Sequence, residues 1–349
     1  MGQHAQRELE LFRELVAIPS PSGREAALAE KVRGIVGGLG FRTETDGAGN
    51  VTVRLEGGDP SAGKVLLAAH LDEIALVVTG VGFDGSLWVD RSGGLLPHKI
   101  GECPVEVMGD KSTVTGVLSM GAAQRDDAED RAPTWNEARI ITGLDADALR
   151  GAGVRPGSTA VPAAFLRGPV LFGDEADPLV AAWTFDDRMG VVCLLRLLEE
   201  VRATGLSPRR PTVVCFTVHE EIGCHGAKVV AQRERPEVFM AVDGCPMPPG
   251  SDLELDGRPG VWSKDSVAHS DQRLVTTLME AAVRAGTELQ VAVYSAAASE
   301  ASKVYEAGAA ERVVTFGYVR ENSHGYEVAR LAVFRNVVAT LVEFVREFR

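Results

Sequence analysis

Hydrophobic and polar positions alternate with two different periods along this chain of 349 residues. Residues 8–18 and 22–38 carry apolar side chains at helical spacing, whereas residues 64–73 predict a strand around the apolar run at 65–69. After Trp183 the chain again alternates between helical patterns and apolar runs. The elements predicted there are helices at residues 188–205, 271–286 and 325–348 and strands at residues 212–220, 238–244, 289–296 and 312–319.

The pattern between these two parts is different. Short β-like pieces in residues 74–179 are separated by Gly, Pro and Asp turns, and the polar residues 121–138 predict a loop. Closely spaced strands of this kind indicate a small barrel or sandwich. We therefore predict an α/β protein with a doubly wound, mostly parallel sheet, formed by residues 1–73 and 180–349 and interrupted by an inserted β domain at 74–179.

Charge and cysteine content narrow the functional classes. A formal net charge of −13 argues against nucleic acid or an anionic membrane as a partner. No apolar run is long enough to cross a membrane, and the polar start resembles no signal peptide. Five cysteines without a CxxC pair favour reduced, buried thiols, so we expect a cytoplasmic protein.

Carboxylates and imidazoles stand where the apolar strands end. The carboxyl ends of parallel strands meet at one edge of a sheet, which is where ligands bind in α/β proteins. A single Asp or Glu at a strand end is more often a cap or turn residue, but here nearly every strand ends this way. The residues concerned are His70, Asp72, Asp186, Asp187, Glu220, Glu221, Asp243 and His324.

This set of side chains has the chemistry of a hydrolytic metal site. Imidazole and carboxylate groups without cysteine suit Zn²⁺, Co²⁺ or Mn²⁺. Glu220 and Glu221 are adjacent at a strand end and point in different directions, so one can bind metal while the other acts as a general base. Asp72 lies on the same face of its strand as His70 and can orient the imidazole.

Several segments extend this interpretation to the whole chain. The sequence resembles the dinuclear metallo-aminopeptidases of the glutamyl and deblocking aminopeptidase type, which have a zinc exopeptidase-like fold and often assemble as tetrahedral dodecamers. The matching segments are IPSPSGRE, AHLDEIALVV, GVRPG, FDDRMG, FTVHEEIGCHGA and AVDG, with SHGYEV as a weaker match.

The resemblance implies two divalent ions per chain, Zn²⁺ or Co²⁺, with Mn²⁺ as a third option. It also implies that Glu220 is the general base, and that Asp186 and Asp187 are joined by a cis peptide bond. A bridging role for Asp187 in place of Asp186 would mean that the alignment is one residue out of register. The implied ligands are His70 and Asp243 for one ion, Glu221 and His324 for the other, and Asp186 as the bridge.

Two departures from the family pattern concern the substrate. The family's Gly-Gly-Thr-Asp-Ala stretch is AAASEAS here, which puts Glu300 where the family has aspartate, near the expected substrate. The family's His-Ser-Pro is replaced by His324, Gly325 and Tyr326. Side-chain preference therefore does not follow from the resemblance.

Other polar residues near these motifs receive no catalytic role. We expect His219, Cys224 and His225 to pack or to support the site. His269, Ser270 and Asp271 are too close in sequence to form a triad, so Ser270 or Asp271 is interpreted as a helix N-cap.

The sequence thus predicts a metallo-aminopeptidase that acts on short peptides, with the insertion serving homo-oligomerisation and restricting access. Three alternatives stay open. One is a deacylase or another amidohydrolase on the same metal site. A second is a paired-carboxylate glycosidase, since some relatives are labelled cellulases, but such an enzyme needs no metal. The third is a non-catalytic oligomeric scaffold with a degenerate site.

Overall fold

The computed structural model describes residues 3–121 and 132–349 and contains one eight-stranded sheet in the order β1-β2-β12-β3-β13-β16-β14-β15. Its central strands β12, β3, β13 and β16 are parallel to one another, and antiparallel pairs flank them. This confirms the predicted α/β class with a mostly parallel sheet. The strands are β1 (Thr43–Thr45), β2 (Val51–Leu55), β3 (Val65–His70), β12 (Thr212–Thr217), β13 (Val238–Pro246), β14 (Pro259–Lys264), β15 (Gln290–Val293) and β16 (Arg312–Arg320).

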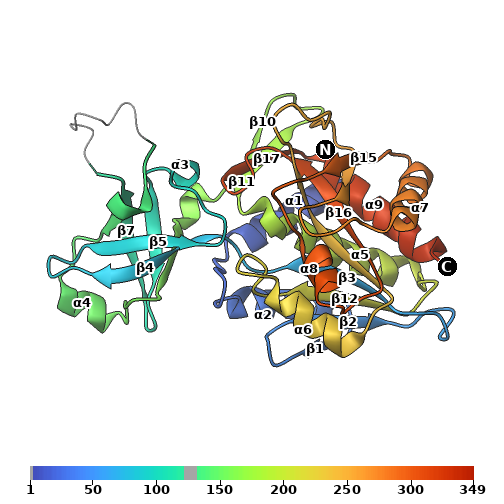
Figure 1. The fold of residues 1–349 in the computed structure, drawn as a ribbon, viewed down its shortest axis with the longest axis horizontal. Coiled ribbons are helices and arrows are strands. Elements are labelled where there is room, and N and C mark those ends of the chain that lie inside the picture. The colour runs from blue at the N-terminus through green and yellow to red at the C-terminus, as the bar shows by residue number, and fades with distance from the viewer. Residues whose placement is uncertain (1–2, 122–131) are drawn as a thin grey trace.

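Helices cover both faces of this sheet (Figure 1). Strand β3 shows why: Leu67 and Ala69 face one apolar core, and Leu66 and Ala68 face another on the opposite side. The first core lies under α1 (Gln3–Val16), α2 (Ala26–Gly38), α5 (Phe185–Thr204), α7 (Gln272–Arg284) and α9 (Ala332–Glu347), and the second lies under α6 (His225–Glu234) and α8 (Glu300–Glu306). None of the helices in the described part of the chain is long and apolar enough to span a membrane.

The inserted segment forms a closed barrel with its own core, and Figure 1 shows it beside the α/β domain. Of the predicted polar loop at residues 121–138, residues 122–131 lie outside the described residues. The barrel strands are β4 (Ala75–Val81), β5 (Leu87–Ser92), β6 (Pro104–Met108), β7 (Thr113–Ser119), β8 (Arg139–Ile141) and β9 (Thr159–Pro162). The short helices of this segment are α3 (Pro97–Ile100), η1 (Trp135–Glu137), α4 (Ala146–Gly151) and η2 (Ala164–Leu166).

A second, three-stranded sheet joins β10 (Val170–Phe172), β11 (Leu179–Trp183) and β17 (Tyr326–Arg330). The prediction of one helix over residues 325–348 is therefore wrong in its first part. Tyr326–Arg330 pairs along the whole of β11, and the helix begins only at Ala332. The predicted domain boundary between residues 179 and 180 falls inside β11, one residue after that strand begins, and β11 pairs with β10.

The predicted N-cap of one helix is confirmed. The Asp271 carboxylate accepts hydrogen bonds from the first turn of α7, as predicted. Helix α2 begins after Glu25 without a side-chain cap. Ser22 donates a hydrogen bond of 2.7 Å to Asp72 Oδ2 and thereby takes part in the site described next.

Candidate active site

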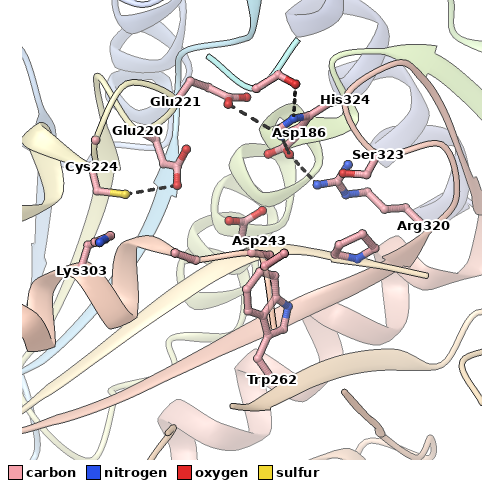
Figure 2. A pocket seen from close by; sticks show the side chains of 16 residues that line it. Asp186, Glu220, Glu221, Cys224, Asp243, Trp262, Lys303, Arg320, Ser323 and His324 are labelled. Carbon is pink, nitrogen blue, oxygen red and sulfur yellow. Dashed lines mark hydrogen bonds and ion pairs between the residues drawn. The ribbon is translucent and has the colours of Figure 1, made fainter. Parts of the chain in front are cut away.

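A cavity of about 350 Å³ lies over the carboxyl ends of the central parallel strands (Figure 2). His70 at the end of β3 is 1% exposed and is not among the residues that line the cavity, but its Nε2 lies 2.9 Å from Asp186, which does line it. The predicted site residues that line the cavity are Asp186, Glu220, Glu221, Asp243 and His324.

Asp186 stands between the two histidines. Its Oδ1 is 2.9 Å from Nε2 of His70, and its Oδ2 is 3.7 Å from Nε2 of His324. The peptide bond between Asp186 and Asp187 is cis, as predicted. Asp187 is fully buried and accepts hydrogen bonds from the His70 main chain at 3.1 Å and from the Tyr318 hydroxyl at 2.9 Å. Asp186 is therefore the residue with one carboxylate oxygen toward each histidine.

Besides His70, Asp72 also contacts the main chain of Glu220 and Glu221, which the sequence did not indicate. Its main-chain oxygen is 3.1 Å from Nδ1 of His70, and its Oδ1 is 3.6 Å from the same nitrogen. The Asp72 carboxylate also accepts hydrogen bonds from the main-chain N–H groups of Glu220 at 2.8 Å and Glu221 at 3.1 Å. One buried carboxylate thus fixes both the imidazole and the turn that carries the two glutamates.

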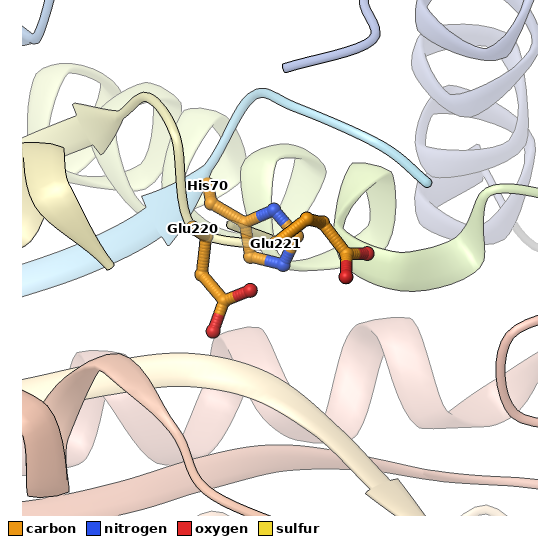
Figure 3. Close-up of side chains that lie close together, drawn as sticks. All are labelled: His70, Glu220 and Glu221. Carbon is orange, nitrogen blue, oxygen red and sulfur yellow. The ribbon is translucent and has the colours of Figure 1, made fainter. Parts of the chain in front are cut away.

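Glu220 and Glu221 point to different sides of the His70 ring (Figure 3). The Cys224 thiol donates to Glu220 Oε1 at 3.3 Å. Glu221 Oε2 is 3.8 Å from Nε2 of His324, whereas its Oε1 is buried without a hydrogen-bond partner. Such an unpaired buried carboxylate oxygen is costly unless a cation or a donor reaches it.

Two residues that the sequence analysis did not single out complete the arrangement. Arg320, the last residue of β16, donates through Nη2 to Asp186 Oδ2 at 2.5 Å. Glu327 is ion-paired with Arg320 and accepts hydrogen bonds from the main-chain N–H groups of Asp186 at 2.9 Å and His324 at 3.0 Å. Both are buried charged residues within strands. Charged residues are rarely buried without a partner, so their position in the predicted elements was the sequence feature that could have identified them.

Glu300, the predicted substrate contact, is 1% exposed at the start of α8 and is not among the residues that line the cavity. Its Oε1 has no hydrogen-bond partner, and burial raises the pKa of Glu300 to about 8. Lys303, one turn further along α8, does line the cavity.

The electrostatics of the site reflect a crowd of buried carboxylates. Burial raises the pKa of Glu220 and of Glu221 well above the ordinary range, and for Glu221 the charge of Asp186 adds to this. Burial and the charge of Asp186 raise the pKa of Asp243 to about 6. Burial also acts to raise the pKa of Asp186, but the charge of Arg320 together with the hydrogen bond and charges of the two histidines outweighs it and holds that pKa below the ordinary value.

These side chains fit a divalent cation. Buried carboxylates that repel one another are stabilised by a cation placed between them, and Glu221 Oε1 has no protein partner. Within the described part of the chain, three sets of side chains bring ligand atoms within 4.8 Å of one another. The sets are His70, Glu220 and Glu221; His70, Asp187 and Asp243; and Asp186, Glu221 and His324.

A buried histidine and carboxylate cluster above a doubly wound sheet defines a class of metal-dependent hydrolases. Residues 49–339 match the sequence profile of the M42 glutamyl aminopeptidase family. The chain belongs to this family, whose members hydrolyse peptide bonds, and this confirms the resemblance and the assignment as an enzyme.

Individual relatives in this family share less than 30% sequence identity with the chain over the matched residues. The chain is 27% identical over 254 residues to the glutamyl aminopeptidase of Lactococcus lactis, covering 68% of this chain and 67% of that protein. It is 29% identical over 239 residues to the lysyl aminopeptidase of Pyrococcus furiosus, covering 67% of this chain and 65% of that protein. The matches therefore span about two thirds of these relatives.

The solved structure of the Pyrococcus horikoshii TET1 peptidase has the same fold, with a TM-score of 0.84 at 23% identity. The superposition covers 98% of this chain and 100% of that one. That peptidase is described as assembling into a tetrahedron or a large octahedral shell.

Proposed function

We propose that this protein is a metal-dependent aminopeptidase that removes N-terminal residues from short peptides with Glu220 as the general base. One observation carries the proposal. Five side chains with metal-binding groups line one cavity, and two of them, the adjacent Glu220 and Glu221, point to different sides of His70. Family membership supports the reaction class.

The ligands fall into two groups that share one residue. When bound, two divalent ions, with Zn²⁺ or Co²⁺ as the first to test and Mn²⁺ next, would activate water and polarise the scissile carbonyl. Asp186 supplies one oxygen to each group, because its two oxygens face different histidines. In this proposal His70 and Asp243 complete one group, and Glu221 and His324 complete the other.

Glu220 takes the proton from the attacking water and delivers it to the leaving amine. The raised pKa of Glu220 suits this role, because a carboxylate with a higher pKa accepts a proton more readily and can then return it. Asp72 supports the step indirectly, since it holds the main chain of Glu220 and orients His70.

The charges around the cavity favour a free N-terminal amine. Glu220 and Asp243 line the cavity and attract an ammonium group, which an acetylated substrate lacks. Lys303 also lines the cavity, beside the small side chains of residues 296–298. We therefore expect N-terminal Glu or Asp to be preferred over Lys or Arg, as in a glutamyl rather than a lysyl aminopeptidase.

The test begins with protein stripped of metal and reloaded with Zn²⁺ or Co²⁺. Release is then measured from free and N-acetylated aminoacyl substrates with acidic, neutral and basic side chains. Metal-dependent turnover of free-amine substrates is the expected result. Turnover of the acetylated substrates alone would establish a deacylase instead, and turnover that survives chelation would contradict the metal dependence.

Replacing the proposed base separates chemistry from metal binding. Glu220→Gln should lower kcat by about 10²–10⁴-fold while the protein keeps the metal content of the parent. The control is Glu288→Gln, an exposed glutamate in the loop between α7 and β15, which should behave as the parent does. Full activity of Glu220→Gln would rule out Glu220 as the base. Equal inactivity of parent and variant, with metal bound, would instead favour the scaffold.

The same proposal includes a homo-oligomer. The barrel exposes large apolar side chains on adjacent strands, with Val117 paired to Ile141 and Trp88 on the next strand. Exposed apolar groups on neighbouring strands are typical of protein interfaces. Light scattering after size exclusion should give a multiple of the 37.1 kDa chain, with twelve copies as the size to test, and a monomer would contradict this part.

A further inference from the structure

The barrel touches the candidate metal centre through one turn, Gly93 and Gly94, between β5 and α3. Gly94 lines the same cavity as Glu221 and His324. Its main-chain oxygen lies 3.2 Å from Nδ1 of His324. The inserted segment therefore contributes directly to the surroundings of a proposed metal ligand.

The contact selects one form of the imidazole. A carbonyl oxygen only accepts hydrogen bonds, so Nδ1 of His324 must carry the proton that it donates to Gly94. Nε2 is then the nitrogen with a free lone pair, and it faces Glu221 Oε2 at 3.8 Å and Asp186 Oδ2 at 3.7 Å. This is the tautomer and the orientation that a metal-binding histidine needs.

Space explains why residue 94 is a glycine. A Cβ atom there would lie 2.4 Å from both Cε1 and Nδ1 of His324. The φ angle of Gly94 is not left-handed, so its constraint is the imidazole and not the backbone conformation. Gly93 is constrained by its backbone, because φ is +78°, and also by space, because a Cβ there would lie 3.2 Å from Glu221 Oε2.

His324 depends on such a contact because little else holds its ring. The residue lies in the loop between β16 and β17 with φ at 58°, and its side chain is 34% exposed. Its main-chain N–H donates to Glu327, which fixes the backbone but leaves the ring free to rotate. Among the hydrogen bonds of the described residues, the one to Gly94 is the contact that sets the ring.

We propose that Gly94 is a positioning residue, through which the inserted barrel completes one of the two proposed ligand groups. This group, formed by Asp186, Glu221 and His324, is called the His324 half of the metal centre, and the group formed by Asp186, His70 and Asp243 is called the His70 half. This inference rests on the proposed function, because it assumes that His324 binds metal. It gives the barrel a role inside each subunit, independent of any role in assembly.

The test uses the full chain with Gly94→Ala, and Gly151→Ala as the matched control. Gly151 lies in the same inserted segment, has no left-handed φ, and a Cβ there meets nothing within 4 Å. Zn²⁺ and Co²⁺ binding is measured by equilibrium dialysis. Gly94→Ala should bind one of two equivalents about 10–100-fold more weakly and keep the other, whereas Gly151→Ala should bind both as the parent does.

A double-mutant cycle with His324→Ala separates positioning from general damage. If Gly94 acts through the imidazole, adding Gly94→Ala to His324→Ala should change metal binding no further, and the double variant should fold as the single one does. Parent-like binding by Gly94→Ala, or a further loss in the double variant, would overturn the inference.

The outcomes also separate this inference from the proposed function. If His324→Ala still binds both equivalents as the parent does, the proposed ligand set fails and the role of Gly94 fails with it. If His324→Ala loses one equivalent and Gly94→Ala loses none, the proposed function stands and only the role of Gly94 is overturned.

Discussion

The two histidines of the proposed metal centre are held in different ways. His70 ends a strand that is paired on both sides in the middle of the sheet, and its side chain is 2% exposed. His324 lies in a loop, and its side chain is 34% exposed. Hydrogen bonds to Asp186 and Asp72 outweigh burial and raise the pKa of His70, whereas burial lowers the pKa of His324.

This difference separates two ways of building a binding site. The His70 half is set by the sheet, so its geometry follows from the packing of the core. The His324 half depends on a few polar contacts from distant parts of the chain, namely Gly94, Arg320 and Glu327. We therefore expect the His70 half to withstand substitutions that weaken the His324 half.

The largest effect should come from the residue that the halves share. Asp186→Asn removes the charge that faces both histidines, so both metal equivalents should bind at least about 100-fold more weakly and turnover should fall below detection. Asp187→Asn is the control, since Asp187 is engaged by protein donors. Zn²⁺ binding by both variants is measured by equilibrium dialysis. Loss of both equivalents in Asp187→Asn but not in Asp186→Asn would identify Asp187 as the shared ligand.

Glu327→Gln should weaken metal binding unequally in the two halves. Its carboxylate anchors the main chain of Asp186 and His324 and pairs with Arg320, so an amide there weakens all three contacts. We expect the metal equivalent at His324 to bind about 10–100-fold more weakly and the equivalent at His70 to weaken less, because only Asp186 is common to both. Glu321→Gln, an exposed glutamate in the loop between β16 and β17, should behave as the parent in the same titration. Equal weakening of both equivalents by Glu327→Gln would show that the halves are not independent.

The smallest effect concerns stability near the His70 half. Burial raises the pKa of Glu300 to about 8 from an ordinary 4.5, so the folded protein holds this proton where the unfolded chain has lost it. The parent therefore loses the contribution of Glu300 to stability as pH rises from about 4.5 to about 8, and this loss is missing in Glu300→Gln. In chelator, the melting temperature of Glu300→Gln should exceed that of the parent at pH 9 and approach it near pH 5.

Glu306→Gln on the same helix should show no such dependence, because Glu306 is exposed. A constant difference between Glu300→Gln and the parent at all pH values would mean that Glu300 does not hold its proton in the folded protein.

The sequence predicted the His70 half better than the His324 half, for physical reasons. His70, Glu220 and Asp243 follow apolar runs, and parallel strands bring such ends together whatever the loops do. Gly94 and His324 meet only through the way the barrel sits beside the sheet, which no local pattern encodes. The strand Tyr326–Arg330 was missed because its partner, Leu179–Trp183, is distant in sequence.

The position of β3 in the sheet has a consequence for synthesis. This strand leaves the ribosome early, but both of its neighbours, β12 and β13, are made only after the whole barrel. Until then an apolar strand has two unpaired edges, which favours association with other chains. The barrel can fold in that interval as a unit with its own core, so nascent chains have most need of chaperones between completion of the barrel and emergence of β13.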